Sequence, residues 1–425
     1  MKHSTTAACI LGAFVLGALI ISGCTGTEPP AAPTPPGTPA PGSMQDIVAA
    51  NNRFASDLYR ELAAGPGSEG KNIFFSPFSL STALAITYEG ARGETADEIR
   101  AVFHFPDDQA RMREGFSGMI SAVNRGDAAY SLRTANALWA EQTYPFLPAY
   151  IRTAEEYYGA ATTNLDFISH PEESRETINT WVEEQTEDRI RDLLQEGDID
   201  PLTRLVITNA IYFKGDWVWQ FDKNETREAD FRTGTGTTVR VPMMAMTGEE
   251  AHFHYAETAD LQILGMPYAS MNGTNLSMVV LLPKGDDLAA AERALDPAVL
   301  PALWDSMTMR EVHVYFPKFR LETRYSLPET LGAMGMPTAF SRNADLSGMD
   351  GTRDLVISDV IHQAFVEVDE EGTEAAAATA VVIRLVSAPA DPVPVVNADH
   401  PFIFLIRDDE TGIILFVGRV ADPAP

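Results

Sequence analysis

The sequence predicts an α+β fold built as a single folded domain, and two observations lead to this prediction. Helix-like patterns dominate the first half of the chain, whereas strand-like apolar runs dominate the second half, without regular alternation of strand and helix. No internal repeat and no shift in composition marks a boundary within residues 43–425. We therefore expect this stretch to fold as one unit.

The start of the chain is predicted to be a targeting segment rather than part of the folded domain. The apolar run Ala7–Ile21 is too short to cross a bilayer comfortably but suits the core of a signal peptide. It ends in Ser22-Gly23-Cys24, which resembles the prokaryotic lipobox. This resemblance implies that residues 1–23 are a lipoprotein signal peptide and that Cys24 carries the lipid. An ordinary cleaved signal peptide that happens to contain Cys24 is the alternative.

Residues 24–42 are predicted to be a lipid-anchored linker, because proline dominates them and bulky apolar side chains are absent. The expected location is the cell envelope, on the outer side of the membrane, or outside the cell after secretion. The membrane is a partner through the lipid on Cys24 alone. The net charge of −29 disfavours nucleic acid as a partner, since phosphates would be repelled.

The folded part offers no signal for a cofactor or a metal. Its only candidates for metal ligation are His252 and His254, and surface histidines are the simpler interpretation. Both cysteines, Cys9 and Cys24, precede the folded part, which excludes a disulfide framework or a cysteine nucleophile there. Sequence motifs of serine hydrolases, zinc peptidases and phosphate-binding loops are also absent.

Three helices are predicted from spacing and capping. Ile47, Phe54 and Leu58 recur at helical intervals within residues 44–64. Ser76 and Pro77 look like a cap and a first turn, and the residues that follow are apolar nearly all round, which predicts a buried helix. A further amphipathic pattern predicts a helix over 177–194.

Strands are predicted from apolar runs rich in β-branched and aromatic residues. The predicted strands are 205–213, 276–283, 311–319, 402–408 and 412–420. The last two are separated by a short turn sequence, which predicts a terminal hairpin.

Residues 366–394 do not fit either pattern. By propensity, Thr373–Ala380 is a helix capped by Thr373, but it has no apolar stripe that could face a core. An exposed loop with small side chains is the other interpretation.

Within this segment, residues 370–379 read Glu370-Glu371-Gly372-Thr373-Glu374-Ala375-Ala376-Ala377-Ala378-Thr379. This run resembles the hinge of the serpins, the serine protease inhibitor family. Other motifs follow in the family's order: Asn72–Ser79, Gly90–Ala96, Asn209–Trp217, Pro317–Phe319, Leu331–Met336, Asp399–Phe404 and Gly418–Val420. The chain is thereby identified as a member of this family.

The resemblance implies a single domain with three β-sheets, surrounding helices and an exposed reactive loop over about 370–396. It also implies that the protein is a monomeric inhibitor rather than an enzyme. A serine protease would cleave this inhibitor and then remain covalently attached to it. In that mechanism the cleaved loop enters the central sheet as an extra strand. Thr373, Ala375, Ala377 and Thr379 would share the inward face, and all four are small enough to enter a core. Gly372 would supply backbone freedom at the bend.

By family spacing, the cleaved bond joins Val386 to Ser387. Val386 favours an elastase-like protease. Arg384 offers a trypsin-like alternative, and cleavage between Leu385 and Val386 is a further possibility. A serpin fold without inhibitory activity also remains open.

The resemblance assigns roles to further residues. Ser76, Ser79, Asn209 and His362 match the family's shutter, which parts to admit the loop, although a buried histidine is otherwise more often a satisfied core group. Trp217 matches the tryptophan where insertion begins. Glu370 and Lys318 match an ion pair that holds the hinge. A surface pair contributes little to stability, so its expected role is to restrain the hinge rather than to stabilise the whole fold.

Two other classes of protein share some of these features. A solute-binding lipoprotein would have the same signal and linker, but it should show two lobes of alternating strands and helices. An anchored peptidase would turn over small substrates, whereas an inhibitor is consumed in each encounter.

Overall fold

The computed structural model describes residues 42–125, 130–248, 251–271, 275–285, 287–373 and 392–424. The helices within these ranges are α1 (Ser43–Ala64), α2 (Pro77–Gly90), α3 (Gly93–Phe103), α4 (Gln109–Val123), α5 (Pro148–Tyr158), α6 (Pro171–Gln185), α7 (Ala289–Ala294), α8 (Leu300–Ser306), α9 (Pro328–Met334) and α10 (Ser347–Asp350). None of these helices is long and apolar enough to cross a membrane.

The strands form three sheets, as predicted, and the α+β class is confirmed. One sheet has the order β1 (Ile73–Phe75), β17 (Ile414–Val420), β16 (Phe402–Asp408), β9 (Leu276–Pro283), β8 (Leu261–Pro267), β7 (His252–Glu257) and β10 (Thr308–Glu311). A smaller one has the order β15 (Val395–Asn397), β11 (His313–Pro317), β6 (Thr238–Met246) and β5 (Arg227–Arg232).

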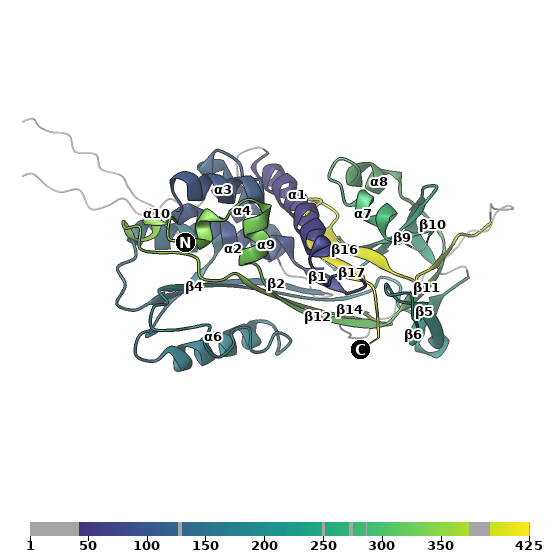
Figure 1. Cartoon of the computed structure of the whole chain (residues 1–425). Helices are drawn as coiled ribbons and strands as arrows, with labels where there is room; N and C mark the ends of the chain where they lie inside the picture. Colours follow the sequence, from purple (N-terminus) through teal and green to yellow (C-terminus); the bar gives the residue numbers. More distant parts are fainter. Residues whose placement is uncertain are drawn as a thin grey trace, which may run out of the picture. The chain divides into compact units, whose positions relative to one another are not determined.

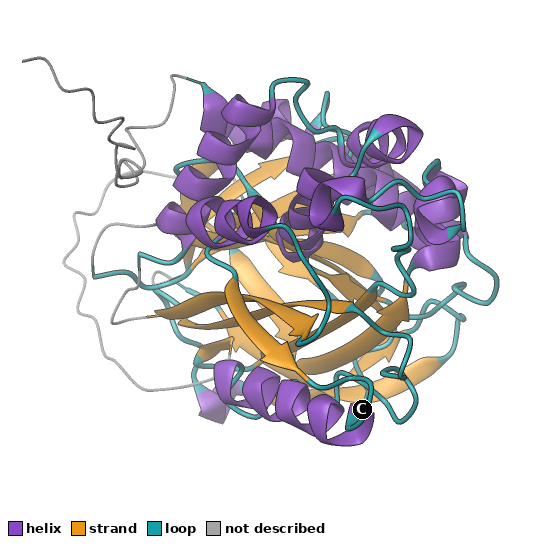
Figure 2. Cartoon of the chain, turned by 90° about the vertical axis from the view of Figure 1, so that its left-hand side faces the viewer, coloured by secondary structure: helices purple, strands orange, loops and turns teal. Residues whose placement is uncertain are grey.

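The third sheet, called the central sheet below, carries the candidate site. Its order is β12 (Phe319–Ser326), β13 (Ile361–Val368), β14 (Gly372–Thr373), β4 (Leu205–Asp216), β2 (Tyr130–Glu141) and β3 (Ala161–Leu165). In Figure 1, helices α1 to α4 and α9 lie on one side of this sheet, and α6 lies on the other. Figure 2 shows the same layering, with the strands lying between helical segments above and below them.

The two faces of the central sheet can be told apart on β13. His362, Ala364, Val366 and Val368 are buried on one face, where His362 contacts Ser76 at the start of α2, and we call this the inner face. Ile361 points the other way and packs with Val182 of α6 on the outer face. This alternation is the period of two that a strand imposes on its side chains.

Helices α1 and α2 begin and end close to the predicted positions. Ser76 caps α2, since its hydroxyl accepts a hydrogen bond from the backbone N of Ser79, and Pro77 occupies the first turn. Nearly every residue of α2 is buried, which agrees with its uniformly apolar sequence.

The predicted helix over 177–194 is wrong at both ends. α6 starts at Pro171 and stops at Gln185, and residues Glu187, Asp188 and Asp192 then adopt left-handed backbone angles that a helix does not allow. Ile190 and Leu193 are buried nonetheless, because the chain folds back and packs them against Val182. The buried residues Ile190 and Leu193 therefore continued the apolar spacing of α6 in the sequence, although they lie outside the helix.

The predicted strand over 311–319 is also wrong, because three strands share that run. β10 ends at Glu311, β11 spans His313–Pro317 and β12 starts at Phe319. Each belongs to a different sheet: β10 pairs with β7, β11 with β6, and β12 with β13. The backbone must therefore turn between sheets at two points inside one apolar run.

The terminal hairpin is confirmed. β16 matches the predicted strand, and β17 starts two residues after the predicted Gly412. The side chain of Asp408 closes the turn by accepting hydrogen bonds from the backbone N of Glu410 and Thr411.

Candidate functional site at the hinge and the central sheet

Residues 369–373 form a tight hairpin turn between β13 and β14. Asp369 organises it: its carboxylate accepts hydrogen bonds from the backbone N of Glu371 and Gly372, at 2.9 and 3.2 Å. The Asp369 backbone N donates to the carbonyl of Gly372. Residues 370–373, predicted as the start of an exposed loop, are thus held at the end of the central sheet.

Thr373 already stands inside the sheet as part of a strand, not of a helix. It pairs with Val368 of β13 and Gly215 of β4, and its side chain is only 1% exposed. Its hydroxyl lies 2.7 Å from the hydroxyl of Tyr268. Burial raises the pKa of Tyr268, so that phenol stays protonated and can share a hydrogen bond with Thr373. The side chain of Thr373 therefore faces inward in this structure.

Gly372 is required by the close approach of β4. A Cβ at this position would fall 2.1 Å from the carbonyl oxygen of Gly215 and 2.7 Å from the Cα of Asp216. Both are backbone atoms of a paired strand and cannot move aside. Because glycine has no side chain, β14 can lie this close to β4 in the sheet.

Glu370 is buried, contrary to the expected surface pair. The Lys318 ammonium donates to one carboxylate oxygen at 2.7 Å, and the Thr226 hydroxyl donates to the other at 2.7 Å. Burial alone would raise the pKa of Glu370, but the hydrogen bonds from Lys318 and Thr226 outweigh it and the pKa is lowered. The carboxylate stays ionised and ties the turn to Lys318, which lies between β11 and β12, and to Thr226, which lies just before β5.

Trp217 packs under the same turn. Its ring stacks on Tyr268 with centroids 4.5 Å apart, and its indole N donates to the carbonyl of Asp369. Its backbone N donates to the carbonyl of Glu371. Trp217 and Tyr268 thus form a floor beneath the point where β14 enters the sheet.

His362 links the central sheet to α2. The backbone N of Ser76 donates to His362 Nε2 at 3.0 Å, and the Ser76 hydroxyl donates to the carbonyl of Leu415 in β17. Burial lowers the pKa of His362 to about 4, so the imidazole is neutral and Nε2 can accept. Ser79 is also buried and donates its backbone N to the Ser76 hydroxyl.

The structure does not bring all predicted site residues together. Asn209 lies on β4 opposite Asn136, but its side chain is outside the described part of the chain. Other predicted residues also lie outside the described residues: Cys24, Ala375, Ala377, Thr379, Val386 and Ser387, with the alternative Arg384.

A cavity of about 400 Å³ separates β4 from β13 at the end of the sheet opposite the hinge. Its lining includes Leu84 of α2, Leu194, Ile207, Met349 and His362. Within the described strands, β13 and β4 are connected by hydrogen bonds only through the two residues of β14. The sheet therefore has a paired end at the hinge and an unfilled end at the cavity.

Sequence reasoning missed Asp369, Tyr268 and Thr226. Asp369 carried a recognisable turn signal, because an aspartate three residues before a glycine often accepts from the turn's backbone. Tyr268 and Thr226 carried none, since only the folded chain brings them to the hinge. Over the described ranges, no group of three histidine, cysteine or acidic side chains could hold a metal ion.

Comparisons with known proteins agree with this geometry. A family model described as Serpin (serine protease inhibitor) matches residues 49–423. An uncharacterized serpin-like protein of Thermococcus kodakarensis is 42% identical over 90% of this chain and 87% of its own length. The leukocyte elastase inhibitor of Bos taurus is 41% identical over 89% of this chain and all of its own length.

Solved structures show the same fold. Serpin48 of the insect Tenebrio molitor has a TM-score of 0.76 and 32% identity, covering 89% of this chain and 98% of its own. Thyroxine-binding globulin in complex with thyroxine has a TM-score of 0.77 and 29% identity, covering 89% of this chain and all of its own. With a family match over most of its length and relatives above 40% identity, this chain belongs to the serpin family.

Proposed function

We propose that this protein inhibits serine proteases by presenting its reactive loop, at about residues 370–396, as bait and inserting the cleaved segment into the central sheet. The observation that carries the proposal is the position of β14, whose two residues already stand between β13 and β4. The next inward positions are Ala375, Ala377 and Thr379, which are small. A strand continuing from β14 would therefore meet no bulky side chain until Val381.

The chemistry needs no catalytic group from this chain. The protease serine attacks the carbonyl carbon of Val386, the bond to Ser387 breaks, and the amine of Ser387 leaves with a proton. Val386 is then held to the protease as an ester. Each backbone hydrogen bond of the inserted strand adds about 1 kcal/mol. About ten of them would provide enough free energy to pull the protease across the sheet and distort its active site.

The proposed target is an elastase-like protease, supported by Val386 at the bond and by the related leukocyte elastase inhibitor. Incubation with elastase should yield a complex that survives boiling in detergent, together with a released peptide that begins at Ser387. The Val386→Arg variant should prefer trypsin. A peptide that begins at Leu385 would assign the bait to Arg384 instead.

A serpin fold also serves other functions, as the thyroxine-binding relative illustrates. Cleavage by every serine protease tested without a detergent-stable complex would therefore leave a non-inhibitory serpin.

We propose further that Cys24 carries a lipid and holds the domain at the outer side of the membrane through the linker 24–42. The support is the lipobox-like end of the apolar run. Mass spectrometry of the mature protein should find Cys24 as an acylated N terminus, and Cys24→Ala should release the protein from the membrane fraction. An unmodified N terminus elsewhere would indicate ordinary secretion.

A further inference from the structure

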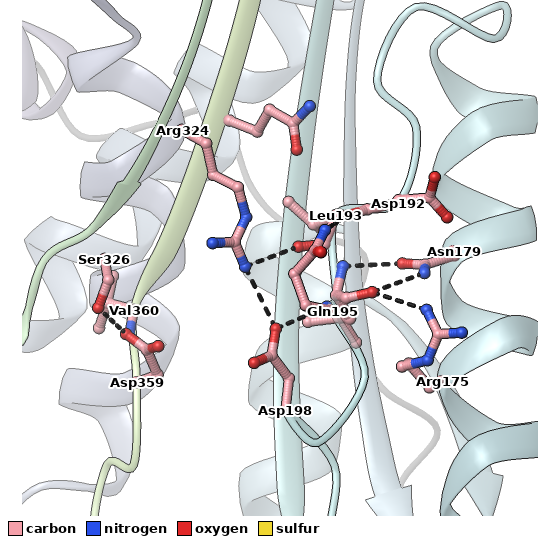
Figure 3. Close-up of polar contacts among 12 residues, drawn as sticks. Arg175, Asn179, Asp192, Leu193, Gln195, Asp198, Arg324, Ser326, Asp359 and Val360 are labelled. Atoms are coloured by element: carbon pink, nitrogen blue, oxygen red, sulfur yellow. Dashed lines mark hydrogen bonds and ion pairs between the residues drawn. The ribbon is translucent and has the colours of Figure 1, made fainter.

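The segment 191–198 closes the outer side of the cavity, where an inserted strand would end. Leu193, Leu194 and Asp198 belong to the cavity lining. The segment follows α6 and leads into β4, and Figure 3 shows it lying between α6 and the strands β12 and β13.

The register of β14 leads to this cavity. Thr373 pairs with Gly215 and Val368, and each further residue of an antiparallel strand moves one residue back along both partners. Residues 379–383 would then lie beside 205–209 of β4 and 358–362 of the chain entering β13. Most of these partners line the cavity. Thr373 faces inward, so Val381 and Ile383 would do the same and occupy the cavity with apolar side chains.

The segment is held by two different sets of contacts. On the α6 side, Asn179 both donates to and accepts from the backbone of Leu194 at 2.9 Å, and Arg175 donates to the Leu194 carbonyl at 2.8 Å. These contacts join neighbouring parts of the chain and can move together with α6.

The second set crosses the insertion path. Arg324 of β12 donates to the Leu193 carbonyl at 3.4 Å and to the Asp198 carboxylate at 3.2 Å. Gln363 of β13 reaches the Arg191 carbonyl at 3.5 Å. An inserted strand needs two strand spacings, about 9.6 Å, between β4 and β13. Parts of these two strands lie closer together than that, so β12 and β13 would have to move away from β4. The Arg324–Asp198 ion pair, at 3.2 Å, would be stretched by this movement unless the segment moves with β12.

We propose that the Arg324–Asp198 ion pair is a latch that must break before the far end of the reactive loop enters the cavity. Arg324 and Asp198 are positioning residues in this scheme, because they act on the sheet and never touch a protease. The scheme rests on the proposed inhibitory function. It adds that the closed sheet is stabilised on its outer face, at the end remote from the hinge.

The test measures sheet opening without a protease. A fluorescent synthetic peptide of residues 375–385 is mixed with the full chain, and its rate of incorporation is followed by native electrophoresis. Arg324→Gln and Asp198→Asn should each speed incorporation about two- to fivefold, the range expected for a partly exposed ion pair. The amide of the Asp198→Asn variant would keep an oxygen for the Gln195 backbone N, which donates to the Asp198 carboxylate at 2.7 Å.

A double variant and a matched control identify the latch. The double variant should incorporate the peptide no faster than either single variant, because both changes remove the same pair. Arg320→Gln is the control, since Arg320 lies on the same strand and pairs with exposed Glu322. It should leave the rate unchanged. If Arg324→Gln does not fold, Arg324→Lys tests the same contact with the charge retained.

The possible outcomes distinguish failure of the latch proposal from failure of the proposed inhibitory function. Peptide uptake at equal rates in wild type and variants, or additive effects in the double variant, would overturn the latch alone. No uptake in any form would overturn both the latch and loop insertion as the proposed mechanism.

Discussion

Protonation of His362 should weaken the native fold in mild acid. The pKa of this buried imidazole is lowered from about 6.5 to about 4, so between these pH values the unfolded chain binds a proton that the folded chain excludes. The stabilisation is therefore complete above pH 6.5 and is lost as the pH falls toward 4. The two pKa values differ by about 2.5, and because one pKa unit corresponds to about 1.4 kcal/mol, the stabilisation amounts to about 3 to 4 kcal/mol.

The structural reason is specific to the link with α2. A protonated Nε2 could no longer accept from the backbone N of Ser76, so that donor would lose its partner inside the core. The assay is urea unfolding followed by tryptophan fluorescence from pH 7.5 to 4.5. The His362→Gln variant keeps an acceptor but does not titrate, so its stability should vary less across this range. The exposed His170→Gln variant should follow the wild type. Identical pH profiles for wild type and His362→Gln would refute the reasoning.

Three further predictions concern the hinge. Glu370→Gln removes the charge that Lys318 binds, so the free energy of unfolding should fall by about 2 kcal/mol. Urea denaturation measures this change, and a decrease of less than about 0.5 kcal/mol would contradict the buried pair. Gly372→Ala should expel β14 from its place beside Gly215, detectable as faster proteolysis within the loop, and unchanged proteolysis would argue against the close approach. Thr373→Arg should convert the inhibitor into a substrate, because a charged side chain cannot enter the inner face of the central sheet. Thr373→Ser should still trap the protease. Trapping by both variants would exclude insertion of the loop at position 373.

Much of the fold could be predicted where the signal was local. β9 and β16 are buried on both faces, so each appears as a continuous apolar run whose ends coincide with the strand. The cap at Ser76 was equally readable, because capping depends on neighbouring residues.

Other features depended on partners that are remote in sequence. β14 is a strand only because β13 and β4 stand on either side of it, and its own sequence favours a helix or a loop. The contact between His362 and Ser76 joins residues 286 positions apart, so no spacing rule could reveal it. Glu370 was expected at the surface because its partners, Lys318 and Thr226, are distant from it in the sequence. The resemblance to the family supplied these residues, and the structure supplies the contacts between them.

The central claim is that the cleaved loop becomes a strand of the central sheet, and one comparison tests it most directly. The loop is cut by a non-target protease, and the melting temperatures of the intact and cut forms are measured side by side. Insertion adds a strand between β13 and β4 and fills the cavity, so the cut form should melt tens of degrees higher, as about ten added hydrogen bonds would require. A cut form that melts at or below the temperature of the intact protein would contradict the claim.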